Sequence, residues 1–166
     1  HFPEELQPIA QYLSTEAESI HSFLAPALYW EPQKKTHVTL VDSSDLANGW
    51  TNPLWRPGIL LYSAMPDSTS ALTYYDHWYR LLFLHEYTHF LNMDATRSFY
   101  TPLRWIFGDV PLPNATLYPW MLEGLAVYYE TRHTKGGRGH STYWDMAIRA
   151  SVLDNTLNTG KGVTLD

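Results

Sequence analysis

The pentapeptide His85-Glu86-Tyr87-Thr88-His89 stands within a stretch that is otherwise almost entirely apolar, and this feature constrains the fold more than any other. The pattern predicts a helix that is capped by Thr73 or Asp76 and continues to about Met93. Its apolar residues lie nearly all round the helix, and a helix of that kind is buried on every side. We therefore expect one central helix that carries a polar motif into the core.

The spacing of the two histidines suits a metal site. Four residues turn a helix through about 400°, so His85 and His89 share one face within about 40° and about 6 Å. Two imidazoles placed in this way fit one tetrahedral zinc ion. Glu86 lies one step round the helix, where its carboxylate can reach a zinc-bound water without occupying a ligand position. The alternative is that two buried histidines merely bond to backbone or carboxylate partners.

Catalytic zinc sites use three protein ligands and leave one position open, so a third donor must come from elsewhere. The chain has no cysteine, and the segment FLNMDA after His89 lacks the Gly and His that a metzincin site requires. Glu123 is the one carboxylate in the apolar stretch 119–126 of a predicted helix, and metal ligation would offset the cost of placing a charge there. A solvated helix face is the alternative for Glu123. Gly124 and Ala126 would let this helix approach its neighbour closely.

The remaining elements predict an α+β fold with a small sheet packed on the central helix. Helices are expected at 8–24, closed before Pro26, at 99–107, at 120–133, and from Ser141 or Thr142 to about Leu153. Strands are expected at 36–41 and 58–62, with a loop between them marked by Asn48-Gly49 and two prolines. A loop is expected at 108–119. The tryptophans at helical positions are assigned to the core: Trp78, Trp105, Trp120 and Trp144.

Composition excludes several classes of partner. Eleven basic against seventeen acidic residues give a formal charge of −6, without a basic run, which argues against nucleic acid and anionic membranes. No apolar run approaches the roughly 18 residues that span a bilayer, so we expect no membrane insertion. The length fits one domain over residues 1–166. The polar tail at 155–166 has no periodic signal and no obvious closing element, so we expect a fragment of a longer protein.

The run HEYTHFL followed by WMLEGLAVYYE resembles the gluzincin metallopeptidases. More closely, the chain resembles the peptidase-like N-terminal domain of bacterial TolB-like proteins, which precedes a β-propeller; DLANG, YDHW, IFG and GGRG also match. The resemblance implies a zincin-like catalytic domain with zinc on His85, His89 and Glu123 and with Glu86 as general base. It also implies that the strand at 58–63 is the edge on which a peptide substrate pairs. A periplasmic or secreted location, and a propeller outside this chain, follow from the same resemblance.

Five further side chains are candidates for supporting roles. Glu130 and Asp94 are placed to orient the imidazoles, with an ordinary surface charge as the alternative for each. Arg138, His140 and Tyr143 follow a Gly-rich turn and are candidates to stabilise the oxyanion, with a solvated loop as the alternative.

The leading functional hypothesis is a zinc-dependent peptidase that acts on peptide or protein substrates. Zinc would polarise the scissile carbonyl and lower the pKa of its water to about 7, and Glu86 would take that proton and pass it to the leaving amine. The alternative is a zinc-containing binding or scaffold module of a propeller protein with little or no turnover, although such a module has little reason to keep Glu86. The sequence leaves open the choice between an endopeptidase and an aminopeptidase.

Overall fold

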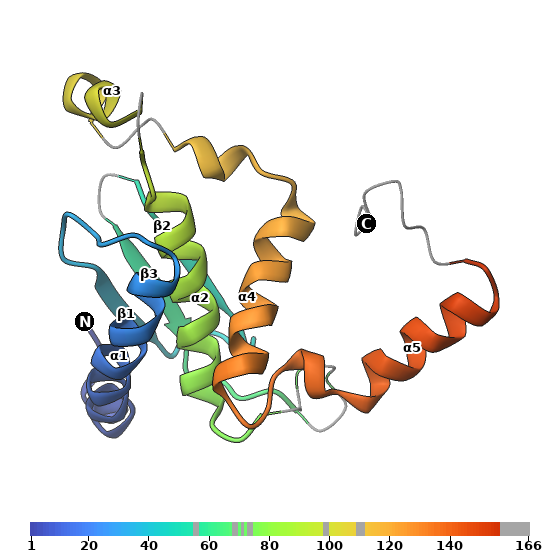
Figure 1. Ribbon diagram of the computed structural model, residues 1–166. Coiled ribbons are helices and arrows are strands. Elements are labelled where there is room, and N and C mark those ends of the chain that lie inside the picture. The colour runs from blue at the N-terminus through green and yellow to red at the C-terminus, as the bar shows by residue number, and fades with distance from the viewer. Residues whose placement is uncertain are drawn as a thin grey trace.

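The computed structural model describes residues 1–54, 57–67, 70, 72, 75–97, 100–108 and 112–156, and Figure 1 shows their arrangement. The fold is α+β, as predicted, with a small mixed sheet and helices packed against it. Thr73 and Phe99, at which two helices were expected to be capped or to start, lie outside the described residues.

The sheet has three strands in the order β1-β3-β2. β1 (His37–Val41) runs parallel to β3 (Gly58–Tyr62), whereas β2 (Gly49–Asn52) runs antiparallel to it. The strands predicted at 36–41 and 58–62 are confirmed, but the expected loop between them contains β2. β2 has only four residues, with Asn48-Gly49 at one end and Asn52-Pro53 at the other. In so short a strand the alternation of buried and exposed residues does not outweigh the turn signals.

The position of β3 corrects the expectation that 58–63 is a free edge. Gly58–Tyr62 pairs with β1 on one side and with β2 on the other, so its backbone groups are already committed. β2 has β3 on one side and no strand on the other among the described residues. The edge that faces the central helix is therefore β2.

The central helix is α2 (Trp78–Asp94), which lies between the sheet, α1 (Gln7–Ala27) and α4 (Pro119–His133) (Figure 1). Twelve of its seventeen residues are buried, which confirms the prediction made from its apolar pattern. The core is formed where Leu84 and Phe90 of α2 meet Leu24 of α1 and Leu61 of β3. α2 begins after His77 rather than at Asp76, whose carboxylate instead accepts the backbone N–H groups of His77 and Lys135.

The other elements agree with the predicted helices in type and nearly in extent. α1 continues through Pro26, which lies in its last turn. A proline there removes only one backbone hydrogen bond, and the amides that follow it still pair with the helix. α4 was predicted within one residue. The expected loop at 108–119 includes a short 3-10 helix, η2. The remaining bounds are η1 (Glu4–Leu6), α3 (Tyr100–Phe107), η2 (Pro113–Thr116), η3 (Arg138–His140) and α5 (Thr142–Leu153).

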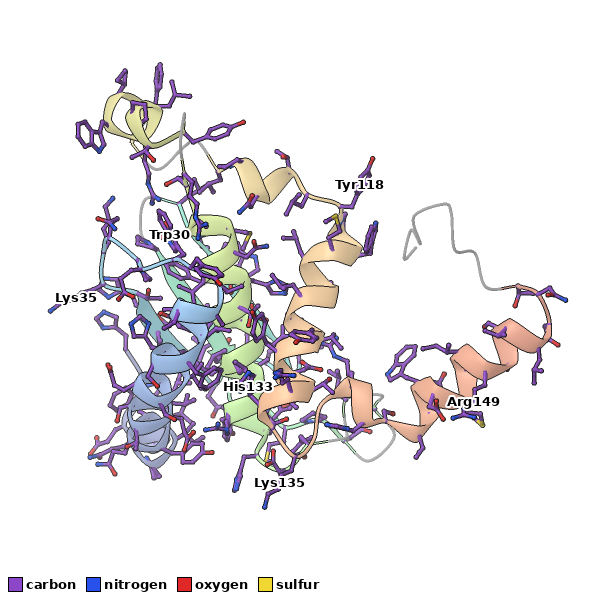
Figure 2. The ribbon with its side chains drawn as sticks, in the orientation of Figure 1. Trp30, Lys35, Tyr118, His133, Lys135 and Arg149 are labelled. Carbon is purple, nitrogen blue, oxygen red and sulfur yellow. The ribbon has the colours of Figure 1, made fainter. Side chains whose placement is uncertain are left out.

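Three of the four tryptophans assigned to the core are on the surface. Trp78 is buried, but Trp105 is 87% exposed, and Trp120 and Trp144 are also exposed. α3 and α5, which carry Trp105 and Trp144, bury no residue among those described, and α5 extends away from the body (Figure 1). Figure 2 shows Tyr118 projecting from the start of α4 and Arg149 projecting from α5. No helix among the described residues is long and apolar enough to cross a membrane.

Candidate metal centre

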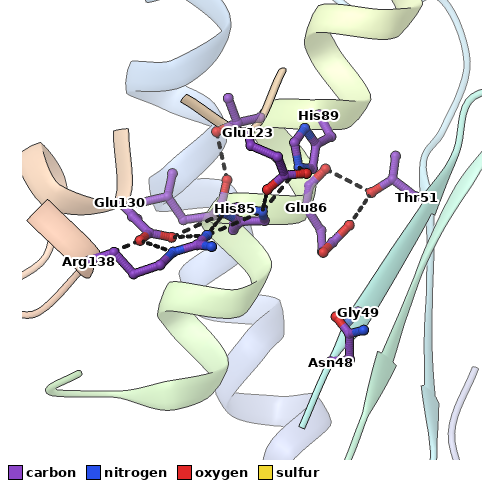
Figure 3. Close-up of polar contacts among 11 residues, drawn as sticks. Asn48, Gly49, Thr51, His85, Glu86, His89, Glu123, Glu130 and Arg138 are labelled. Atoms are coloured by element: carbon purple, nitrogen blue, oxygen red, sulfur yellow. Dashed lines mark hydrogen bonds and ion pairs between the residues drawn. The ribbon is translucent and has the colours of Figure 1, made fainter. Parts of the chain in front are cut away.

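His85 and His89 of α2 and Glu123 of α4 come together in the structure (Figure 3). The two Nε2 atoms are 3.0 Å apart, and the Glu123 carboxylate oxygens lie 3.3 Å from Nε2 of His85 and 3.2 Å from Nε2 of His89. A tetrahedral zinc ion with ligands at about 2.0–2.1 Å requires donors about 3.3–3.4 Å apart. The three donors therefore fit one zinc ion. Among the described residues, they are the one group of three or more such side chains that could hold a metal.

Burial and charge differ across these three residues. The side chains of His85 and His89 are 10% and 12% exposed, whereas that of Glu123 is 48% exposed. Hydrogen bonds with His85 and His89 hold the pKa of Glu123 below its ordinary value, although burial opposes them. Glu123 is thus a charged carboxylate aimed at two imidazoles, at the solvent-facing side of the site.

The close approach of α4 to α2 does not depend on Gly124. A Cβ added at Gly124 would meet nothing within 4 Å, whereas Ala126 is fully buried. The expectation that Gly124 permits the approach is therefore wrong, because this residue faces open space. The small side chain that the packing requires is that of Ala126.

Glu86 is held by β2. Its side chain is buried, and the Thr51 hydroxyl donates to Glu86 Oε2 at 2.7 Å and lies 2.9 Å from the Glu86 backbone oxygen. A Cβ added at Gly49 would lie 2.7 Å from Cγ of Glu86, so only glycine leaves room for this side chain. Figure 3 shows Thr51 and Gly49 on the strand beside Glu86. Neither residue was predicted as part of the site, because both lie on a four-residue strand that is flanked by turn signals.

Glu130 supports His85 from the opposite side. Its side chain is completely buried, and its Oε2 lies 3.0 Å from Nδ1 of His85. Arg138 donates to the other carboxylate oxygen from its backbone N–H at 3.0 Å and from Nε at 2.9 Å. Burial raises the pKa of Glu130, but the hydrogen bonds from His85 and Arg138 outweigh it and bring the pKa to about 2. The structure therefore places Glu130 where an orienting carboxylate was predicted.

Nδ1 of His85 lies near both a donor and an acceptor, and a metal held by Nε2 would decide which of them it pairs with. Arg138 Nη2 lies 2.7 Å from Nδ1 and Glu130 Oε2 lies 3.0 Å from it, and one nitrogen cannot accept from the first while donating to the second. A metal held by Nε2 would require the proton on Nδ1, which would then donate to Glu130. With the proton on Nδ1, the Nε2 lone pair would be available for the ion on the side where Glu123 lies.

The Gly-rich turn after α4 positions Arg138 beside the site. Gly137 adopts a left-handed conformation, with φ at 95°, and a Cβ there would lie 2.9 Å from the Thr131 backbone. A Cβ at Gly139 would lie 2.6 Å from Oγ1 of Thr131. Both glycines let the turn lie directly on α4, so that Arg138 can reach Glu130.

The other predicted supporting residues lie away from the metal ligands. Asp94 accepts from Trp30 Nε1 at 2.8 Å and from Arg104 Nη2 at 2.6 Å, so it fixes the end of α2 and neither orients an imidazole nor lies on the surface. His140 Nε2 bonds to the Thr131 backbone oxygen at 2.9 Å. Tyr143 is exposed and packs edge-on against Trp144. Of the three candidate oxyanion donors, Arg138 is the one that reaches the site.

A cleft of about 430 Å³ opens over the site, between β2, α2 and the start of α4. Its polar lining includes the three candidate ligands, Glu86, Thr51 and Arg138. Its apolar lining includes Trp50, Leu72, Trp78, Leu81, Leu82, Met93, Pro119 and Leu122.

Comparison with protein-family models, with curated proteins and with solved structures finds no match to this chain.

Proposed function

We propose that this protein is a zinc-dependent peptidase of the gluzincin type, with a zincin-like fold. The observation that carries the proposal is the convergence of three donors within 3.0–3.3 Å of one another, beside a carboxylate that is not needed as a ligand. His85, His89 and Glu123 would hold the ion. When bound, zinc would polarise the scissile carbonyl and lower the pKa of the attacking water to about 7.

Glu86 acts as general base and then as general acid. Its carboxylate takes a proton from the attacking water and returns it to the leaving amine. Thr51 donates to Oε2, so the proton goes to Oε1, the oxygen that Thr51 does not hold. Glu86 and the ligand His85 are adjacent in sequence, and their side chains point about 100° apart round the helix, so one can hold the ion while the other handles the proton.

Glu130 and Arg138 act through His85. Glu130 fixes the ring of His85 with Nε2 toward the ligand site, and Arg138 compensates the buried charge of Glu130. The edge of β2 that pairs with no strand among the described residues is the place where an extended peptide can add as a further strand, since β3 is paired on both sides.

The resemblance to the peptidase-like domain of TolB-like proteins extends this proposal. We infer from it an exported, periplasmic or secreted protein, in which a β-propeller follows this domain. The acidic balance of the chain agrees with a peptide or protein substrate rather than a nucleic acid.

The test measures metal content and peptide hydrolysis. We expect one zinc per chain by elemental analysis and hydrolysis of a mixed peptide library. Glu86→Gln should retain zinc and lose at least about 100-fold in rate, because general base catalysis contributes about 10²–10⁴-fold. Glu5→Gln, on the exposed first turn of the chain, is the matched control and should behave as wild type.

Two results would separate the alternatives. A protein that binds no zinc, or a Glu86→Gln variant that hydrolyses peptides at the wild-type rate, contradicts the peptidase. Bound zinc with no open coordination position and no hydrolysis of any peptide would instead indicate the zinc-containing binding module.

A further inference from the structure

The cleft continues past the candidate metal centre in both directions. Its floor is one face of α2, which lines it from Trp78 to Met93, and His85 and His89 lie between these two ends. Fifteen residue steps of helix measure about 22 Å. That length accommodates about six residues of extended peptide at about 3.3 Å each. A bound chain therefore has room on both sides of the site.

Apolar side chains line both arms of this cleft. At one end lie Met93 of α2 and Leu122 of α4. Nearby, Asn114 Nδ2 donates to the Asn92 backbone oxygen at 2.8 Å and holds η2, which precedes α4, beside the end of α2. At the other end lie Trp78 and Leu81. Each arm can thus accept an apolar side chain of a bound peptide.

The carboxylates of the cleft are already engaged. Recognition of a free amino terminus needs a carboxylate that pairs with the ammonium group. The described residues that line the cleft include two carboxylates, Glu86 and Glu123. Glu86 is bonded to Thr51, and Glu123 lies against both imidazoles. The groups that would hold an amine are the same groups that the chemistry uses.

We propose that the cleft takes an extended internal segment of a polypeptide, with apolar side chains on both sides of the metal centre, and not a free amino terminus. This inference rests on the proposed function, and it makes the protein an endopeptidase. Pairing with β2 then holds the backbone of the segment, and the two arms select its side chains.

The first experiment compares peptides of about eight residues, built from alanine and leucine, that differ only in acetylation of the amino terminus. We expect kcat/KM for cleavage of internal bonds to change by less than about threefold on acetylation. For an enzyme that pairs the amine with a carboxylate, acetylation would lower kcat/KM at least about 30-fold, which is the effect of removing one partner of a buried charge pair. Release of N-terminal residues alone, abolished by acetylation, overturns this inference and leaves the peptidase proposal standing.

The second experiment measures binding without turnover. Zinc-loaded Glu86→Gln protein is titrated with the acetylated peptide by calorimetry, and with the same peptide carrying aspartate in place of its leucines. We expect binding of the acetylated leucine peptide and at least about tenfold weaker binding of the aspartate peptide. Binding with this preference supports the cleft assignment even if no peptide is hydrolysed, and equal or absent binding of the two peptides overturns it.

A pair of variants tests one arm of the cleft. Leu122→Ala should weaken binding of the leucine peptide about five- to tenfold through lost apolar contact. Met121→Ala is the matched control, because Met121 is the neighbouring residue of the same helix, is exposed and does not line the cleft. Equal effects of the two substitutions contradict the assignment of this arm.

Discussion

Thr51→Val removes the hydroxyl that holds Glu86, the proposed general base, and leaves the shape of the side chain nearly unchanged. Thr51 is buried on β2, and its hydroxyl donates to Oε2 of Glu86 at 2.7 Å. Valine fills the same space but leaves the buried Glu86 carboxylate without this donor. We expect a fall in kcat with little change in KM, because Thr51 acts on the base and not on the bound peptide.

The size of the effect follows from the kind of hydrogen bond. A hydrogen bond to a buried, charged carboxylate contributes about 1.5–3 kcal/mol. If all of it is lost from the transition state, the rate falls about 10- to 150-fold. Thr51→Ser keeps the hydroxyl and should retain most of the wild-type rate.

A double-mutant cycle with Glu86→Gln shows whether Thr51 acts through Glu86. The assay measures kcat for a blocked fluorogenic peptide, together with zinc content, for both single variants and the double variant. We expect Thr51→Val to cost little in the Glu86→Gln background, where no base remains to be positioned. An equal loss in both backgrounds, or a loss below about threefold in the wild type, would refute the reasoning.

Three further predictions concern the same site. Gly49→Ala should lower kcat with zinc retained, because its Cβ would lie 2.7 Å from Cγ of Glu86, whereas Gly124→Ala, which meets nothing within 4 Å, should leave turnover unchanged. The pKa of Glu130 is about 2 in the fold against an ordinary 4.5, so the metal-free protein should lose on the order of 3 kcal/mol of unfolding free energy as the pH falls from about 4.5 to about 2. Glu130→Gln should flatten that acid limb in urea titrations, and an unchanged limb contradicts the assignment. Burial lowers the pKa of His85, but its carboxylate partners outweigh burial and raise it, so zinc binding should release a proton and weaken as the pH falls. Calorimetry in buffers of different ionisation enthalpy measures that release, and identical heats would contradict it.

The parts of the site that lie on one helix were predictable from spacing. The positions of His85, His89 and Glu86 on α2 follow from the helical repeat, and the burial of α2 follows from its apolar residues. Glu130 follows from its distance of seven residues from Glu123, which returns it to nearly the same face of α4. Local geometry fixes these relations, so no knowledge of the tertiary structure was needed.

The contacts between elements were not predictable in the same way. Thr51 and Gly49 reach Glu86 only because β2 pairs with β3 and lies against α2, and four residues between turn signals did not indicate a strand. The rings of Trp105 and Trp144 show the same limit, because they were assigned to the core from their helical positions and are exposed in the structure. Helical periodicity describes which residues share a face, but it does not say whether another element covers that face.

The apolar circumference of α2 and the chemistry proposed for it have one physical cause. His85 faces α4, where Glu123 and Glu130 meet it, while the next residue, Glu86, faces β2 and Thr51. A helix that offers a ligand to one neighbour and a base to another must be packed on both of those sides, and α1 covers a third. The residues between the functional side chains therefore have to be apolar in every direction. A lone amphipathic stripe would have left either the ligand or the base in solvent, where its position would not be fixed.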